Sequence, residues 1–149
     1  MGGHDSYGKD LLSRVFGPRF DRGAPGRSVI VGGIEIRLDG IIIGAESGQI
    51  ECAVEVEAEN EPQVRGAVLN LFLHPAPKAL LLLMPRHMNN PLPRAIAHFQ
   101  SVWTRLTGSA RGDLPIVCLK GDGNTPAWAE DEARLRRELS ALGFSLKLP

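Results

Sequence analysis

Three acidic side chains are spaced so that they would meet on one face of a β-sheet. Asp39 ends an alternating apolar–polar segment that begins at Ile34, and Glu55 and Glu57 belong to a second alternating segment after a turn. Because strand side chains alternate between the two faces, a hairpin turn centred on Ser47 places Asp39 directly opposite Glu55. Their Cβ atoms would then lie about 5 Å apart, where like charges destabilise a sheet.

The acidic cluster can be stabilised in three ways. The carboxylates can be solvated, they can pair with Arg37 and Arg65, or they can bind a divalent cation. Carboxylate oxygens are preferred ligands of Mg²⁺ and Mn²⁺, and a bound metal can activate water and stabilise charge on a phosphoryl oxygen. Alternating glutamates on a solvent-facing strand are common, so solvation stays open. The strand lies between a hairpin and a helix–strand unit, which predicts a central strand and favours the metal.

The elements that would position these acids follow from hydrophobic periodicity. Two alternating segments predict antiparallel strands, and continuous apolar runs of strand length predict strands covered on both faces. A hairpin that continues into β-α-β units implies an α/β fold: a three-layer α/β/α sandwich with a mixed central sheet. The expected order begins with a helix near 9–17 and two or three antiparallel strands from 29 onward, which include a strand at 34–39 extended by 41–44 and a strand from 49. It continues with a helix from 62 to 74 capped by Asn60 or Glu61, a strand at 79–84, a helix at 91–108, a strand at 115–121, a helix at 127–143 and a short edge strand at 144–148.

Composition indicates one globular domain over residues 1–149, with an N-terminal helix and loop (1–27) and a core (28–149). Acidic and basic residues balance at 17 each, which argues against a coat of positive charge but allows a local basic face. Cys52 and Cys118 lie in apolar runs. With no signal peptide recognised, we expect reduced thiols, a cytoplasmic location and no membrane segment.

The order and spacing of these elements resemble the PD-(D/E)XK nuclease superfamily, the restriction-endonuclease-like fold, over residues 7–120. In that superfamily an Asp near the end of one strand is followed by an acid-X-Lys on the next. Here RLDG supplies Asp39, and VEVEA supplies Glu55-Val56-Glu57. Glu57 stands where Lys is usual, as it does in a minority of restriction enzymes.

The resemblance implies a metal-dependent nuclease that cleaves DNA. Asp39 and Glu55 would bind Mg²⁺ or Mn²⁺, joined by the backbone carbonyl of Val56, and Glu57 would orient or deprotonate the attacking water. The catalytic set implied is therefore Asp39, Glu55 and Glu57. Many enzymes of this fold act as dimers, so a homodimer is compatible with the resemblance.

Four further residues are candidates for contact with nucleic acid. Gln63 and Arg65 occupy the first turn of a predicted helix, where the helix N-terminus favours anions. Arg86 and His87 follow a buried strand, and loops at strand ends often carry function. The alternatives are a salt bridge from Arg65 to Glu61 and a plain connector at 85–91.

The N-terminal arginines form the best basic cluster, a weak hint of nucleic-acid contact. Its members are Arg14, Arg19, Arg22 and Arg27. Two other functions stay open beside the nuclease: a catalytically inactive nuclease-fold module for nucleic-acid binding or assembly, and an unrelated α/β domain whose acidic strand is solvated.

Overall fold

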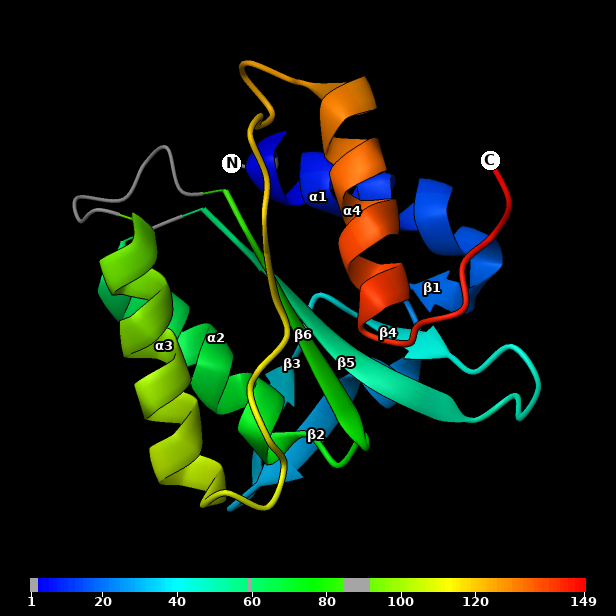
Figure 1. Cartoon of the computed structure of the whole chain (residues 1–149). Helices are drawn as coiled ribbons and strands as arrows, with labels where there is room; N and C mark the ends of the chain where they lie inside the picture. The colour runs from blue at the N-terminus through cyan, green and yellow to red at the C-terminus, as the bar shows by residue number, and fades with distance from the viewer. Residues whose placement is uncertain (1–2, 59, 85–91) are drawn as a thin grey trace.

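A five-stranded mixed sheet forms the centre of the protein (Figure 1). The computed structural model describes residues 3–58, 60–84 and 92–149. The strand order is β1-β4-β5-β6-β7, with β1, β4 and β5 antiparallel and β5, β6 and β7 parallel. The strands are β1 (Phe20–Asp21), β4 (Gly40–Ile43), β5 (Ile50–Glu57), β6 (Lys78–Leu83) and β7 (Ile116–Cys118). The strand with the glutamates, β5, therefore lies between β4 and β6, which confirms that it is central.

Helices cover both faces of this sheet (Figure 1). One face carries α1 (Gly3–Phe16) and α4 (Trp128–Ala141), and the other carries α2 (Glu61–Leu73) and α3 (Leu92–Thr107). Alternation in β5 explains the two cores, because Cys52 and Val54 enter the core beneath α1 and α4 while Ala53 enters the core beneath α2 and α3. The predicted α/β layering and mixed sheet are confirmed.

Helix α2 begins as the sequence predicts. The Asn60 side chain accepts a hydrogen bond from the backbone N–H of Gln63 at 3.3 Å, and Pro62 stands in the first turn. This is a common way to satisfy a free amide at a helix start. Within the described ranges, no helix combines the length and the apolar character that crossing a bilayer requires.

The strand predicted at 34–39 forms over Ile34–Arg37, but its predicted continuation through 41–44 as one strand is wrong. The chain forms a separate hairpin, β2 (Ser28–Val31) and β3 (Ile34–Arg37), before it enters β4. The reversal occurs at Gly32 and Gly33, whose φ angles are 57° and 82°. A two-residue turn of this kind needs positive φ at both positions, which glycine adopts without strain. Two short 3₁₀ turns, η1 (Gly17–Arg19) and η2 (Pro25–Arg27), precede the hairpin.

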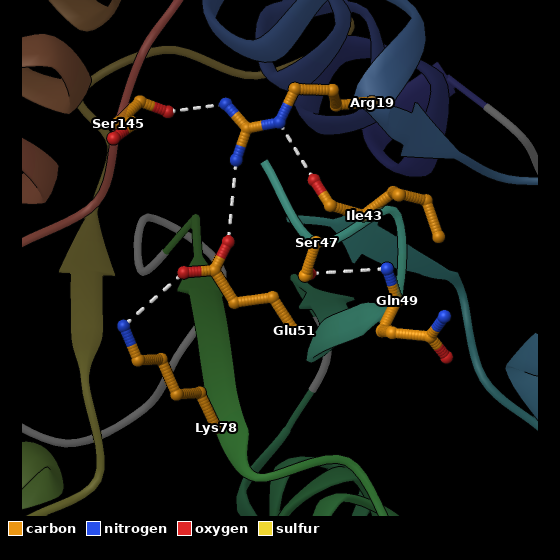
Figure 2. Close-up of polar contacts among 7 residues, drawn as sticks. All are labelled: Arg19, Ile43, Ser47, Gln49, Glu51, Lys78 and Ser145. Atoms are coloured by element: carbon orange, nitrogen blue, oxygen red, sulfur yellow. Dashed lines mark hydrogen bonds and ion pairs between the residues drawn. The ribbon is translucent and has the colours of Figure 1, made fainter. Parts of the chain in front are cut away.

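The predicted edge strand at 144–148 is also wrong, because other contacts hold this tail. Phe144 is buried in the core beneath α1 and α4. The Lys147 amide donates to the carbonyl oxygen of Val15 at 2.8 Å, at the end of α1. The guanidinium of Arg19 donates to the Ser145 carbonyl oxygen at 2.6 Å (Figure 2). The end of α1 and the side chain of Arg19 thus make hydrogen bonds with the backbone of the tail. The sequence pattern had indicated that a neighbouring strand would do so.

Candidate metal and nucleic-acid site

Asp39 and Glu55 meet directly, in the register expected for a turn centred on Ser47. Gly40 pairs with Val54 across β4 and β5, so the preceding residue, Asp39, lies opposite Glu55. The two residues exchange hydrogen bonds with each other's strand. The Val56 amide donates to Asp39 Oδ2 at 2.7 Å, and the Asp39 amide donates to Glu55 Oε1 at 3.0 Å. The backbone therefore fixes both carboxylates.

Glu55 is buried, with 7% of its surface exposed. The solvated-strand interpretation is therefore wrong for this residue. Burial, and then the negative charge of Asp39, raise the pKa of Glu55 to about 8 from an ordinary value of 4.5. Hydrogen bonds from Asn70 and from the Asp39 amide favour the charged form and act in the opposite direction. The site thus holds two acids whose proximity disfavours full ionisation.

Two residues that the sequence analysis did not single out complete this cluster. Lys9 of α1 places Nζ 3.6 Å from Asp39 Oδ1, with 21% of the lysine side chain exposed. Asn70 of α2 donates from Nδ2 to Glu55 Oε2 at 3.0 Å. A polar residue inside the apolar run VLNLFL was a usable signal for Asn70. Lys9 gave no such signal, because it precedes the acids by thirty or more positions and reaches them only through packing of α1.

The other predicted catalytic residue, Glu57, and the predicted metal ligand Val56 lie close by on β5. Glu57 is two residues beyond Glu55 and partly buried, and its Oε1 accepts a hydrogen bond from the Ala58 amide at 3.3 Å. Val56 contributes its amide to Asp39. The structure thus places the predicted triad on adjacent strand ends, with Asp39 and Glu55 in direct contact.

The predicted nucleic-acid contacts have different outcomes. Gln63 is exposed in the first turn of α2. Arg65 donates from Nη1 to Nε2 of His98 on α3 at 3.2 Å, so the expected salt bridge to Glu61 is not the contact it makes. Arg86 and His87 lie outside the described residues.

The N-terminal basic cluster is engaged within the protein. Arg14 pairs with Glu132, Arg22 pairs with Asp10, and Arg27 donates to the Leu38 carbonyl oxygen. Arg19 donates to the carbonyl oxygens of Ile43 and Ser145 and to Glu51, as Figure 2 shows. All four arginines thus have partners within the protein, and their contact with nucleic acid stays a prediction.

Glu51, at the other end of β5, illustrates a carboxylate with full charge compensation. Its Oε1 lies 3.2 Å from Arg19 Nη2, and its Oε2 lies 3.3 Å from Lys78 Nζ (Figure 2). Glu55 has the opposite environment, because its nearest charged neighbour is another acid. Two glutamates of one strand are thus held in different ways: Glu51 by cations, and Glu55 by neutral donors beside a like charge.

The donor set at Asp39 and Glu55 suits a hard divalent cation. Each of three carboxylate oxygens accepts one hydrogen bond and the fourth faces Lys9, so each keeps acceptor capacity. Magnesium characteristically uses one or two protein carboxylates and several waters. Over residues 3–58, 60–84 and 92–149, no group of three or more His, Cys, Asp or Glu gathers into a potential metal site. A cation bound by this pair would have to take most of its ligands from water.

Comparisons with known proteins give no family for this chain. No family model, curated protein or solved structure matches it. The functional argument consequently depends on the residues and their geometry.

Proposed function

We propose that this protein is a divalent-metal-dependent nuclease that hydrolyses phosphodiester bonds in DNA. The observation that supports it is the contact of Asp39 with the buried Glu55 at the end of a central strand. A buried acid in contact with a second acid is costly to ionise, and acids perturbed in this way are concentrated at functional sites. Mg²⁺ or Mn²⁺ held there would supply positive charge to a phosphoryl oxygen and acidify a bound water.

Each residue of the site has a role in this proposal. Asp39 and Glu55 bind the cation, together with the carbonyl oxygen of Val56. Glu57 orients the attacking water by accepting its proton in a hydrogen bond. Lys9 provides the positive charge that an acid-X-Lys sequence would normally carry, because Nζ lies 3.6 Å from Asp39 Oδ1. Negative charge develops on the phosphoryl group during hydrolysis, and a fixed cation beside the site stabilises it.

Contacts with the substrate backbone would come from the start of α2. Gln63 is exposed there and can donate from its amide. Arg65 is partly exposed in the same turn and contacts a ring nitrogen of His98, so no acid neutralises its charge through that contact. Together with the α2 N-terminus, these groups favour a phosphate oxygen.

One observation favours a second function, a nuclease-fold module that binds nucleic acid or assembles without catalysis. In the described part of the chain, the acids that meet are two, with no third ligand from His, Cys, Asp or Glu. The hydrogen bonds from Asn70, Val56 and Asp39 also hold the pair without a metal.

Metal-dependent stabilisation tests the site directly. We expect Mn²⁺ to raise the melting temperature of the wild-type protein and to have no such effect on Glu55→Gln, which loses the carboxylate but keeps the side-chain volume. The matched control is Glu51→Gln on the same strand, whose carboxylate faces Arg19 and Lys78. Mn²⁺ should stabilise that variant as it stabilises the wild type.

Cleavage of plasmid and single-stranded DNA then separates the two functions. The nuclease requires Mg²⁺- or Mn²⁺-dependent cleavage that Glu55→Gln loses and Glu51→Gln retains. If Mn²⁺ raises the melting temperature of the wild type but the wild type does not cleave DNA, the nuclease is rejected in favour of the non-catalytic module. If Mn²⁺ raises the melting temperatures of Glu55→Gln and wild type equally, the metal does not bind at Asp39 and Glu55.

A further inference from the structure

One long segment of this chain carries positive charge without any acid. Residues 62–112 contain no Asp or Glu, although acids make up 17 of the 149 residues overall, about one in nine. The same segment contains six basic side chains: Arg65, Lys78, Arg86, Arg94, Arg105 and Arg111. The even charge balance of the whole chain therefore hides a strong asymmetry along it.

In the fold, this segment includes nearly all of α2 and the whole of α3, which together form the layer on one face of the sheet (Figure 1). The helix α3 presents one exposed stripe at helical spacing: Arg94, His98, Ser101 and Arg105. Its buried residues Ala95, Phe99 and Trp103 pack into the core beneath α2 and α3. Arg65 of α2 joins the stripe by its 3.2 Å contact with His98. We call Arg65, Arg94, His98 and Arg105 the α3 basic face.

In the opposite layer, by comparison, two arginines of α4 form ion pairs with glutamates of the same helix. On α4, Arg136 pairs with Glu132 at 3.1 Å and Arg134 pairs with Glu138 at 3.8 Å. Among the described residues, by contrast, none of the three arginines of the α3 basic face has an acidic partner. Because these three arginines have no acidic partner there, their field extends into solvent over roughly a Debye length, about 8 Å at physiological salt.

The position of this face relative to the Asp39–Glu55 site is set by the topology. Helix α2 follows the end of β5 and α3 follows the end of β6, and these strands are parallel. Both helices therefore begin at the edge of the sheet where Glu55 and Glu57 lie. Arg65 and Arg94 stand near those helix starts, and Arg105 is eleven residues further on, about 16 Å along the axis. That length matches about five phosphates of one DNA strand at 3.4 Å each.

We propose that the α3 basic face binds the sugar–phosphate backbone of duplex DNA that extends from the Asp39–Glu55 site. A polyanion complements a face of arginines without acids, and Arg and polar donors such as Ser101 are ordinary phosphate contacts. The inference rests on the proposed function for its choice of DNA as the ligand. It adds a sequence-independent binding surface to which Arg94 and Arg105 contribute.

The test is duplex binding in EDTA, where binding is read without cleavage. Fluorescence anisotropy of a labelled duplex, measured from 50 to 200 mM salt, compares wild type with Arg94→Gln/Arg105→Gln. Each phosphate contact contributes about 0.9 to the slope of log affinity against log salt, so we expect the slope to decrease by about two. Affinity at 50 mM salt should fall about tenfold or more. Each single variant should show about half of the slope change.

The matched control is Arg134→Gln/Arg137→Gln on α4, which also removes two positive charges but from the opposite layer. This control should bind duplex with the wild-type slope, and melting curves should show that both double variants are folded. The inference is overturned if the α3 and α4 double substitutions weaken duplex binding equally. It is also overturned if the wild-type protein shows no salt-dependent binding of the duplex. Cleavage without dependence on the α3 basic face overturns this inference and leaves the proposed function. Duplex binding that depends on the α3 basic face, without any cleavage, supports this inference and rejects the proposed nuclease activity.

Discussion

At the scale of single residues, the proposed nuclease makes a specific prediction for Lys9, because no lysine follows Glu55 in its own strand. The variant Lys9→Met removes the charge 3.6 Å from Asp39 Oδ1 and keeps an unbranched side chain. We expect DNA cleavage to slow about 100-fold, the usual effect of removing one group that stabilises transition-state charge. Mn²⁺ should bind as tightly as before or more tightly, because an ammonium group no longer competes for Asp39. Cleavage rates and Mn²⁺-dependent melting curves measure the two effects separately.

Two further variants show whether the effect of Lys9 is specific. Lys9→Arg restores the charge and should recover part of the rate. Lys78→Met removes a lysine that pairs with Glu51 at the other end of β5, and it should change neither cleavage nor Mn²⁺ binding. Parallel loss of cleavage and metal binding in Lys9→Met would mean that Lys9 only holds Asp39 in place.

The raised pKa of Glu55 predicts how the stability of the metal-free protein depends on pH. Its pKa in the folded protein is raised to about 8, so between pH 4.5 and 8 the folded state holds a proton that the unfolded state has released. Stability from this group is therefore present at low pH and is lost as pH rises through 8. In EDTA, the melting temperature of Glu55→Gln relative to wild type should increase from pH 5 to pH 8.5 by several degrees. A difference that is constant with pH would contradict a protonated Glu55.

At the scale of elements, the sequence predicted most helices and the central strands because local patterns decide them. The alternation around Glu55 identified β5, and the Asn60-X-Pro62 start identified α2. The same alternation predicted the contact of Asp39 with Glu55, because register follows from the turn. Alternation also predicted the strand that contains Ile34 and Ile36, but it did not predict that this strand pairs with β2 in a separate hairpin. The glycines at 32 and 33 are a turn signal that the pattern of apolar residues outweighed.

The tail and Lys9 were missed for a different reason. Residues 144–148 alternate like a strand, but their partners, among them Arg19 and Val15, lie more than a hundred positions away in the sequence. Lys9 likewise meets Asp39 only when α1 packs against the sheet. Contacts of this kind depend on tertiary packing, which no local periodicity encodes.

At the scale of the whole molecule, the sheet joins two cores, and each contains one cysteine. Cys52 lies in the core beneath α1 and α4, while Cys118 packs against the core beneath α2 and α3. Successive residues of β6 alternate between them, since Leu80 and Leu82 enter the first core and Leu81 enters the second. The same strands support both cores, so unfolding one layer exposes the other. A domain of this size normally unfolds in one cooperative step.

The two thiols can therefore report whether the layers unfold together. Burial raises the pKa of Cys52, and it raises the pKa of Cys118 to about 11, so the folded protein contains little reactive thiolate at pH 8. We expect labelling of both thiols, identified by mass spectrometry after brief exposure to a thiol reagent in increasing urea, to rise with one shared midpoint. Cys118 has the higher baseline because it is partly exposed. If Cys118 became reactive at clearly lower urea than Cys52, the layer of α2 and α3 would unfold on its own, and the DNA-binding face proposed for α3 would belong to a separately folding unit.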